Sequence, residues 1–91
     1  MPDKTIYVGK KPVMAYVTAC ITCLNDNYLQ GGSEVMVAAR GNSISRVVDV
    51  IEVLKRFVRY EVKGVEFGTD KIDQDGGTRN ISTIRVTLRK F

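Results

Sequence analysis

Four stretches of the chain carry the apolar pattern of β-strands. β-Branched and alternating apolar residues predict strands over residues 5–9, 34–40, 60–71 and 83–89. The second stretch is apolar almost throughout, which is typical of a central strand. In the fourth, Ile84, Val86 and Leu88 alternate with polar residues, so one face of this strand is expected to be buried and the other open to solvent.

The last two strands are predicted to form a long hairpin. The alternation of residues 60–71 shifts phase at Lys63-Gly64, where we expect a β-bulge. The Asp-Gly chemistry of residues 73–78 predicts the turn. Two strands of about ten residues, at about 3.4 Å per residue, span roughly 30 Å. Because a small core covers less than this length, we expect the tip to project into solvent.

The first of two predicted helices follows Pro12, a residue that the first turn of a helix tolerates. Apolar residues then recur from Val13 to Tyr28 at the spacing of one helical face. The glycine pair Gly31-Gly32 is expected to end this helix.

The second predicted helix starts in the turn of residues 40–46, where Asn42 or Ser43 is the expected N-cap, and runs to about Arg59. Its apolar residues cover roughly 220° of the circumference, which is wider than packing on one core requires. The extra stripe indicates contact with a second subunit. The residues predicted for such an interface are Val50, Val53, Leu54 and Phe57.

The predicted elements follow one another in the order βαβαββ. A strand–helix–strand start favours a right-handed crossover between two parallel strands. We therefore predict an α/β fold, a two-layer sandwich in which a mixed four-stranded sheet carries two helices on one face and a long C-terminal β-hairpin arm. The length of 91 residues, without a linker or an internal repeat, fits a single domain over residues 1–91.

The absence of histidine removes a large group of enzyme mechanisms. The chain has no imidazole base for a serine or cysteine triad and no imidazole metal ligand. Asp49 and Glu52 stand one helical turn apart, but an exposed carboxylate pair of this kind is typical of a solvated helix face. We therefore predict that the protein is not an enzyme and uses no metal or cofactor.

Cys20 and Cys23 form a Cys-x-x-Cys pair. A structural zinc needs four ligands, which a chain without histidine or further cysteines cannot supply alone. A thioredoxin-type pair starts a helix, whereas this pair lies in the middle of the first predicted helix. We expect both cysteines to be packing residues.

The hydropathy and charge of the chain bear on its location and partners. No apolar run approaches the roughly 20 residues of a membrane span, and the N-terminal residues lack the apolar core of a signal peptide. We therefore expect a cytoplasmic protein without membrane contact. A net charge of +4 and a pI near 9.3 favour an anionic partner.

Basic residues follow the first two strands. Lys10 and Lys11 come after the first strand, and Arg40 and Arg46 bracket the turn into the second helix. Because the carboxyl ends of neighbouring parallel strands meet at one edge of a sheet, we expect these side chains to lie together beside helix N-termini. Cations and free N–H groups at such an edge form a phosphate site.

These basic residues also fit ordinary structural roles. A lysine pair is common in solvated turns, and Arg40 could pair with Asp49 or Glu52. Two further cations, Lys71 and Arg79, flank the hairpin tip. The residues alone leave the functional and the structural interpretation open.

Three segments match a known pattern when taken together. They are Gly-Lys-Lys-Pro-Val at residues 9–13, Ala-Arg-Gly-x-x-Ile-Ser at residues 39–45, and Ser-Thr-Ile at residues 82–84 leading to Arg89-Lys90. With them the chain resembles the Alba proteins, small basic chromatin proteins of archaea, over nearly its whole length. The resemblance implies the βαβαββ fold and a homodimer that coats and compacts double-stranded DNA in the nucleoid, usually without sequence preference, and that also binds RNA.

The resemblance also assigns residues. The family's lysine pair corresponds to Lys10 and Lys11 and its arginine before glycine to Arg40, which form the central surface facing the nucleic acid while the hairpin arms reach along the minor groove. Lys10 matches a lysine that is acetylated in some relatives. Phe57 resembles an aromatic residue at contacts between neighbouring dimers on DNA. The residues predicted to bind nucleic acid are Lys10, Lys11, Arg40, Asn42, Ser43, Arg46, Lys71, Arg79 and Asn80.

Some positions depart from the family pattern. Asn42 stands where relatives often carry a second basic residue, and Asp70, Asp73 and Asp75 make the hairpin tip acidic. Residues 26–30 form an insertion-like stretch. A heterodimer with a paralogue would also fit the family.

The alternative function is that of an RNA-binding subunit of a ribonucleoprotein. A protein that reads RNA is expected to present exposed aromatic residues for stacking. The four tyrosines occupy mostly core-like positions in the pattern, namely Tyr7, Tyr16, Tyr28 and Tyr60. We therefore favour DNA as the main target.

Overall fold

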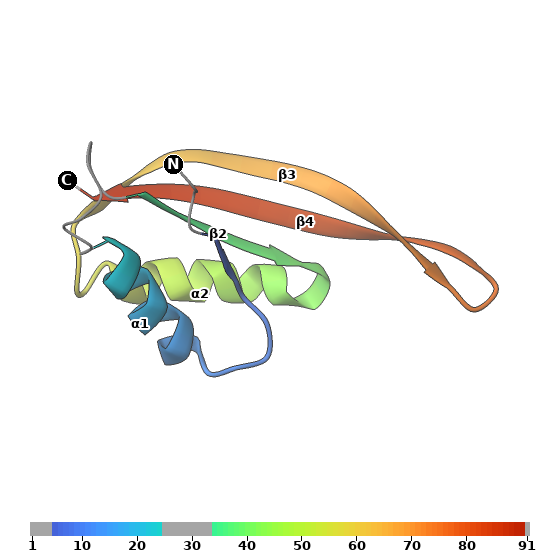
Figure 1. Cartoon of the computed structure of the whole chain (residues 1–91), viewed down its shortest axis with the longest axis horizontal. Coiled ribbons are helices and arrows are strands. Elements are labelled where there is room, and N and C mark those ends of the chain that lie inside the picture. Colours follow the sequence, from blue (N-terminus) through green and yellow to red (C-terminus); the bar gives the residue numbers. More distant parts are fainter. Residues whose placement is uncertain (1–4, 25–33, 91) are drawn as a thin grey trace.

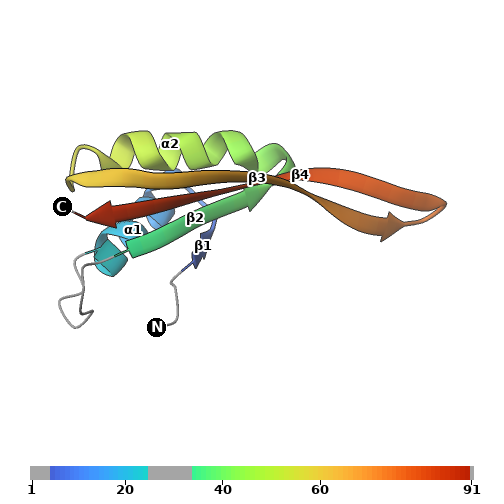
Figure 2. The same ribbon diagram turned by 90° about the horizontal axis from the view of Figure 1, so that it is seen from above.

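The computed structural model describes residues 5–24 and 34–90, and within them it shows a four-stranded sheet with two helices on one face (Figures 1 and 2). The elements are β1 (Thr5–Tyr7), α1 (Val13–Leu24), β2 (Glu34–Arg40), the 3₁₀ turn η1 (Gly41–Ser43), α2 (Ile44–Leu54), β3 (Tyr60–Gln74) and β4 (Gly77–Lys90). The strand order is β1-β2-β4-β3, with β1 parallel to β2 and the other pairs antiparallel. The predicted fold class is confirmed.

The core lies between the helices and one face of the sheet. Val35, Val37 and Ala39 of β2 point into it, as do alternate residues of β4 from Ile84 to Leu88. This alternation follows from the pleat, which sends successive side chains to opposite faces. In the described part of the chain, no helix covers the other face of the sheet, and residues such as Arg40 and Arg85 are exposed there.

The hairpin arm extends beyond the rest of the sheet. β2 pairs with β4 only as far as Arg40 opposite Thr83, whereas β3 and β4 remain paired out to Gln74 opposite Gly77. The arm therefore begins beyond the pair of Gly68 and Thr83 and runs for about six residue pairs, or roughly 20 Å (Figure 1). The predicted projection is confirmed, and the register shift between Val62 and Gly64 confirms the bulge.

Several predicted boundaries are wrong. β1 ends at Tyr7 rather than at residue 9, and α2 ends at Leu54 rather than near Arg59. The hairpin strands also extend into the predicted turn of residues 73–78, because β3 ends at Gln74 and β4 begins at Gly77. The chain leaves α2 through tight turns, in which the N–H of Phe57 and the N–H of Val58 both donate to the Leu54 carbonyl. The predicted continuation of the first helix through Tyr28, its end at Gly31-Gly32 and the stretch 26–30 lie outside the described residues.

The wide apolar arc of α2 has its explanation within the chain. α2 packs against both α1 and the sheet, so two neighbours in one core require a broad apolar surface. Val50 and Leu54 are fully buried there, which corrects their assignment to an interface because neither presents surface to a partner. Val53 is half-buried and Phe57 is 57% exposed, and both stay candidates for an interface.

Two features bear on the cysteines and on membranes. Cys20 is fully buried and Cys23 is half-buried, both as free thiols packed with the core, which agrees with the packing role predicted for them. Burial, and then the neighbouring Cys23, raises the pKa of the Cys20 thiol to about 12.

Within residues 5–24 and 34–90, neither helix is long and apolar enough to cross a membrane.

Deprotonation of Cys20 should destabilise the fold at high pH. The pKa of this thiol is about 12 in the folded chain against an ordinary value of 9.0, so the native state holds the proton more strongly than the unfolded state. This contribution is fully present below about pH 9 and is lost as the pH rises towards 12. Urea unfolding between about pH 7 and pH 11 should therefore show a steeper loss for the wild-type chain than for Cys20→Ala. An equal loss of unfolding free energy in the two proteins would contradict the raised pKa of Cys20.

Candidate nucleic-acid interface

One hydroxyl group binds two backbone amides of the loop that carries Lys10 and Lys11. Tyr16, on the first turns of α1 and 8% exposed, accepts hydrogen bonds from the backbone N–H groups of Gly9 (2.8 Å) and Lys11 (3.0 Å). Both lysines are exposed. A fixed backbone beneath two exposed ammonium groups lowers the entropy lost when they meet an anion. The core position predicted for Tyr16 is confirmed, but its bonding to the lysine loop was not apparent from the pattern.

Arg46 joins this loop to α2. Its guanidinium donates to the backbone carbonyl of Lys11, and its Nε is buried without a hydrogen-bond partner. The two basic segments therefore lie side by side, as the predicted parallel pairing requires, and the Val8 N–H completes the contact by donating to the Ala38 carbonyl (2.8 Å). Arg46 thus has a structural role that the sequence did not reveal, in addition to its predicted contact with phosphate.

Arg40 ends β2 at the same edge of the sheet. Its guanidinium lies 3.9 Å from the Asp70 carboxylate at the root of the arm, and both side chains are more than half exposed. The neighbouring acid is therefore Asp70 rather than Asp49 or Glu52, and Glu52 instead pairs with Lys55 (3.1 Å). An exposed pair at this distance contributes at most about 1 kcal/mol. Arg40 remains available to a phosphate.

The turn after Arg40 positions the N-terminus of α2. Gly41 has a φ of 60°, a left-handed conformation that favours glycine, and it reverses the chain into η1. Asn42 is exposed and Ser43 half-buried. Ser43 takes the N-cap position of α2, as predicted, but its side chain makes no capping hydrogen bond, so the predicted side-chain contact is wrong. The 3₁₀ turn itself takes the place of a side-chain cap.

The basic residues of the arm do not share one face. Lys71 lies directly opposite Asn80, whereas Arg79 lies opposite Ile72, and successive residues of a strand point to opposite sides. Lys71 and Asn80 therefore belong to the helix-bearing side of the sheet and Arg79 to the open side. At the tip, Asp73 accepts a hydrogen bond from the Thr78 hydroxyl (3.3 Å).

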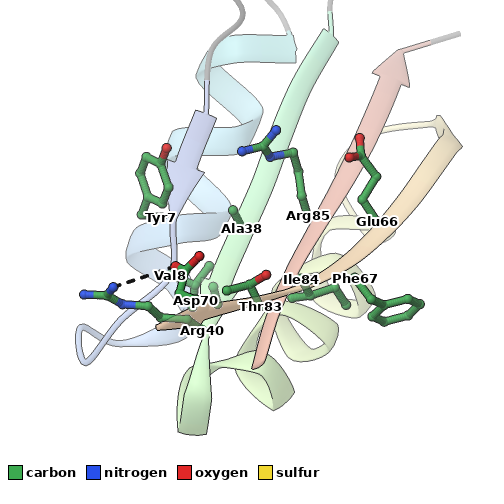
Figure 3. A pocket seen from close by; sticks show the side chains of 12 residues that line it. Tyr7, Val8, Ala38, Arg40, Glu66, Phe67, Asp70, Thr83, Ile84 and Arg85 are labelled. Atoms are coloured by element: carbon green, nitrogen blue, oxygen red, sulfur yellow. Dashed lines mark ion pairs between the residues drawn. The ribbon is translucent and has the colours of Figure 1, made fainter. Parts of the chain in front are cut away.

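Sequence reasoning missed the open face of the sheet. Tyr7 was expected in the core, but it is 71% exposed and lies opposite Ala38 on that face. With Arg40, Asp70 and Arg85 it lines a cavity of about 570 Å³ (Figure 3). Tyr60 is half-buried and donates to the Ile51 carbonyl (2.6 Å), whereas Tyr28 lies outside the described residues.

Comparisons with known proteins agree on one family. The Alba family model matches residues 4–69. The curated protein "DNA/RNA-binding protein Alba 1" of Archaeoglobus fulgidus is 44% identical over 92 residues, which cover 99% of each chain. Among solved structures, Alba from Thermoplasma volcanium is similar with a TM-score of 0.83 and 32% identity, over 96% of this chain and all of that one. ALBA1 from Trypanosoma brucei is similar with a TM-score of 0.75 and 26% identity, over 99% of this chain and 71% of that one.

Removal of the Tyr16 hydroxyl should loosen the lysine loop. Tyr16→Phe keeps the ring in the core but leaves the N–H groups of Gly9 and Lys11 without their acceptor, which should cost about 1–3 kcal/mol of unfolding free energy. Hydrogen exchange should accelerate at these two amides. Tyr60→Phe is the matched control, because it removes one hydroxyl bond from another part of the core. Equal exchange at the two loop amides in both variants would refute the role of Tyr16.

Proposed function

The chain belongs to the Alba family, and on this basis we propose that it binds double-stranded DNA without sequence preference, as a homodimer that coats and compacts the chromosome, and that it also binds RNA. The observation that carries the proposal is the edge of the sheet at which Lys10, Lys11 and Arg40 come together on an ordered backbone. Lysine and arginine at such an edge contact backbone phosphates, which position a protein on DNA without reading bases. The 44% identical relative named as a DNA/RNA-binding protein supports both targets.

The exposed apolar surface between α2 and β3 is where we place the dimer contact. At 100° per residue, Val48 lies on the flank of α2 opposite to Arg46, and Arg46 faces the start of α1. Val48 therefore faces the β3 side of the molecule. Val65 and Phe67 lie opposite core residues of β4, so they belong to the helix-bearing face of β3. These three side chains are 46–79% exposed, and a second copy of the chain would cover them.

The dimer brings two lysine edges and two arms to one DNA molecule. An arm of about 20 Å is long enough to follow a groove beyond the body. Lys71 and Asn80 on one side of the arm, or Arg79 on the other, would make its contacts, and Asn42 and Ser43 would add polar contacts beside Arg40. Val53 is placed at a contact between subunits or between neighbouring dimers, and Phe57 at a contact between neighbouring dimers. A paralogue could take the place of one subunit.

The proposal also covers the location of the protein, its modification and its catalytic activity. The protein would be cytoplasmic and associated with the archaeal nucleoid, as a single domain over the whole sequence. Lys10 is exposed, and its acetylation would remove one phosphate contact per subunit.

The family is one of nucleic-acid binding, and we assign no catalytic activity. The alternative, an RNA-binding subunit of a ribonucleoprotein, is favoured by one observation, the exposed ring of Tyr7.

The salt dependence of binding tests the phosphate mechanism. If each subunit neutralises about four phosphates, a dimer neutralises about eight, and log K should fall with log salt at a slope of about −7. Fluorescence anisotropy on unrelated DNA duplexes over a salt series measures this slope. A slope shallower than about −2 would refute the mechanism. Lys10→Ala with Lys11→Ala should weaken binding to all duplexes alike and flatten the slope.

Charge in the apolar surface should separate the subunits. Phe67→Glu buries a carboxylate against the partner, so the mass in sedimentation should fall from that of two chains to the 10.1 kDa of one. Phe57→Glu is the matched control, an exposed aromatic residue outside this surface, and should leave the dimer intact. The proposed surface is wrong if Phe67→Glu stays dimeric, whether or not Phe57→Glu separates the subunits.

A further inference from the structure

The open face of the sheet carries a cavity whose walls combine an aromatic ring with opposite charges. The pairing registers place Tyr7, Ala38, Arg85 and Glu66 in one row across the four strands. Small side chains leave the space beneath them, because Ala38 lies in the middle of the row and Gly68 lies in the next one. The volume of about 570 Å³ is in the range of about 300–1,000 Å³ that is typical of small-molecule sites (Figure 3).

The charges of the cavity favour a base over a phosphate. Two guanidinium groups, of Arg40 and Arg85, are balanced by the carboxylates of Glu66 and Asp70, so the cavity as a whole does not attract an anion. It does offer hydrogen-bond donors and acceptors side by side, because Arg85 lies opposite Glu66 in the strand register and Arg40 lies beside Asp70. A nucleobase is a flat neutral group with both, and carboxylates accept from the exocyclic amino groups of bases.

The exposed tyrosine supplies the surface on which a base can stack. The ring of Tyr7 is 71% exposed on edge strand β1, with its side chain beside Ala38 at one end of the cavity (Figure 3). Stacking on aromatic side chains is the main contact of proteins that hold single strands, because every base has a flat face. A paired base inside a duplex cannot reach such a ring.

The cavity adjoins the phosphate-binding edge. Arg40 belongs to both, since it lines the cavity and ends β2 beside the lysine loop. Tyr7 is separated from Lys10 by only Val8 and Gly9. A strand whose phosphate lies on Lys10 and Arg40 can therefore turn its next base onto Tyr7.

We propose that the open face of the sheet is a second binding site, which takes the unpaired base of a single-stranded RNA or DNA between Tyr7, Arg85 and Glu66. This proposal rests on the proposed function, because the phosphates of the same strand bind at the edge formed by Lys10, Lys11 and Arg40. The base site differs from that edge because a duplex does not occupy it. Single-stranded and double-stranded nucleic acids would thus share the edge and differ on the open face.

The test compares four proteins on three probes: a single-stranded 12-mer as RNA and as DNA, and a DNA duplex of unrelated sequence. Tyr7→Leu should weaken binding of the single strands about tenfold by anisotropy and change duplex binding less than twofold. Tyr7→Phe, which keeps the ring, should bind single strands as the wild type does. A comparison of the RNA 12-mer with the DNA 12-mer shows whether the sugar contributes to binding.

A fourth protein fills the cavity without removing a charge or a ring. A Cβ at Gly68 would lie 2.9 Å from the Thr83 hydroxyl oxygen, so Gly68→Leu requires the Thr83 side chain to shift and then places its own side chain on the cavity floor. It should also weaken single-strand binding and spare the duplex. Circular dichroism and thermal unfolding check that each variant folds.

The outcomes separate the two proposals. If duplexes bind with the expected salt slope but Tyr7→Leu and Gly68→Leu both bind single strands normally, the base site is wrong and the duplex function stands. If the wild type binds no duplex, the proposed function fails whatever the variants do. If Tyr7→Phe loses single-strand binding as completely as Tyr7→Leu, stacking is not the contact and the proposal is overturned.

Discussion

The parallel pairing of β1 with β2 is the constraint on which the rest of the structure depends. Because the two strands run in the same direction, their carboxyl ends lie at one edge, and the loops that follow them must meet there. Lys10 and Arg40 are 30 residues apart in the sequence and neighbours in space for this reason alone. The same pairing requires α1 as a crossover, and α1 in turn supplies Tyr16, whose hydroxyl fixes the lysine loop. The topology therefore positions the basic residues, and the side chains of Tyr16 and Arg46 hold the backbone of the lysine loop in place.

The two faces of the sheet follow from one rule, the alternation of side chains along each strand. On the helix-bearing face, the apolar residues of β2 and β4 are covered by α1 and α2. β3 is an edge strand that meets α2 through Tyr60 at its start, and farther along the helices do not cover it. Its apolar residues Val65 and Phe67 are therefore left exposed. On the open face, the same alternation exposes Tyr7 and Arg85. Under the two proposals, one sheet would divide its contacts between a second copy of the chain and nucleic acid.

The sequence predicted those features that depend on local pattern. The alternation from Ile84 to Leu88, the phase shift at Lys63-Gly64 and the strand–helix order each have a period or a turn chemistry that is visible in the residues. It did not predict the features that depend on pairing across the chain. The Arg40–Asp70 contact needs the hairpin register, and Val50 and Leu54 were assigned to a partner because the position of α1 beside α2 is not a local property. Tyr7 was missed because a three-residue strand is too short to show which face its last side chain takes.

Arg40 connects the lysine edge to the open face, and the energetics of its ion pair allow it to serve both. The guanidinium and the Asp70 carboxylate are 3.9 Å apart and more than half exposed, so water screens the pair and its net contribution is at most about 1 kcal/mol. A phosphate forms shorter, bidentate hydrogen bonds with a guanidinium and can replace the carboxylate at little cost. Asp70, once released from Arg40, becomes an available acceptor at the mouth of the cavity. Phosphate binding at the edge would therefore leave the open face more acidic, which favours the amino edge of a base over a second phosphate.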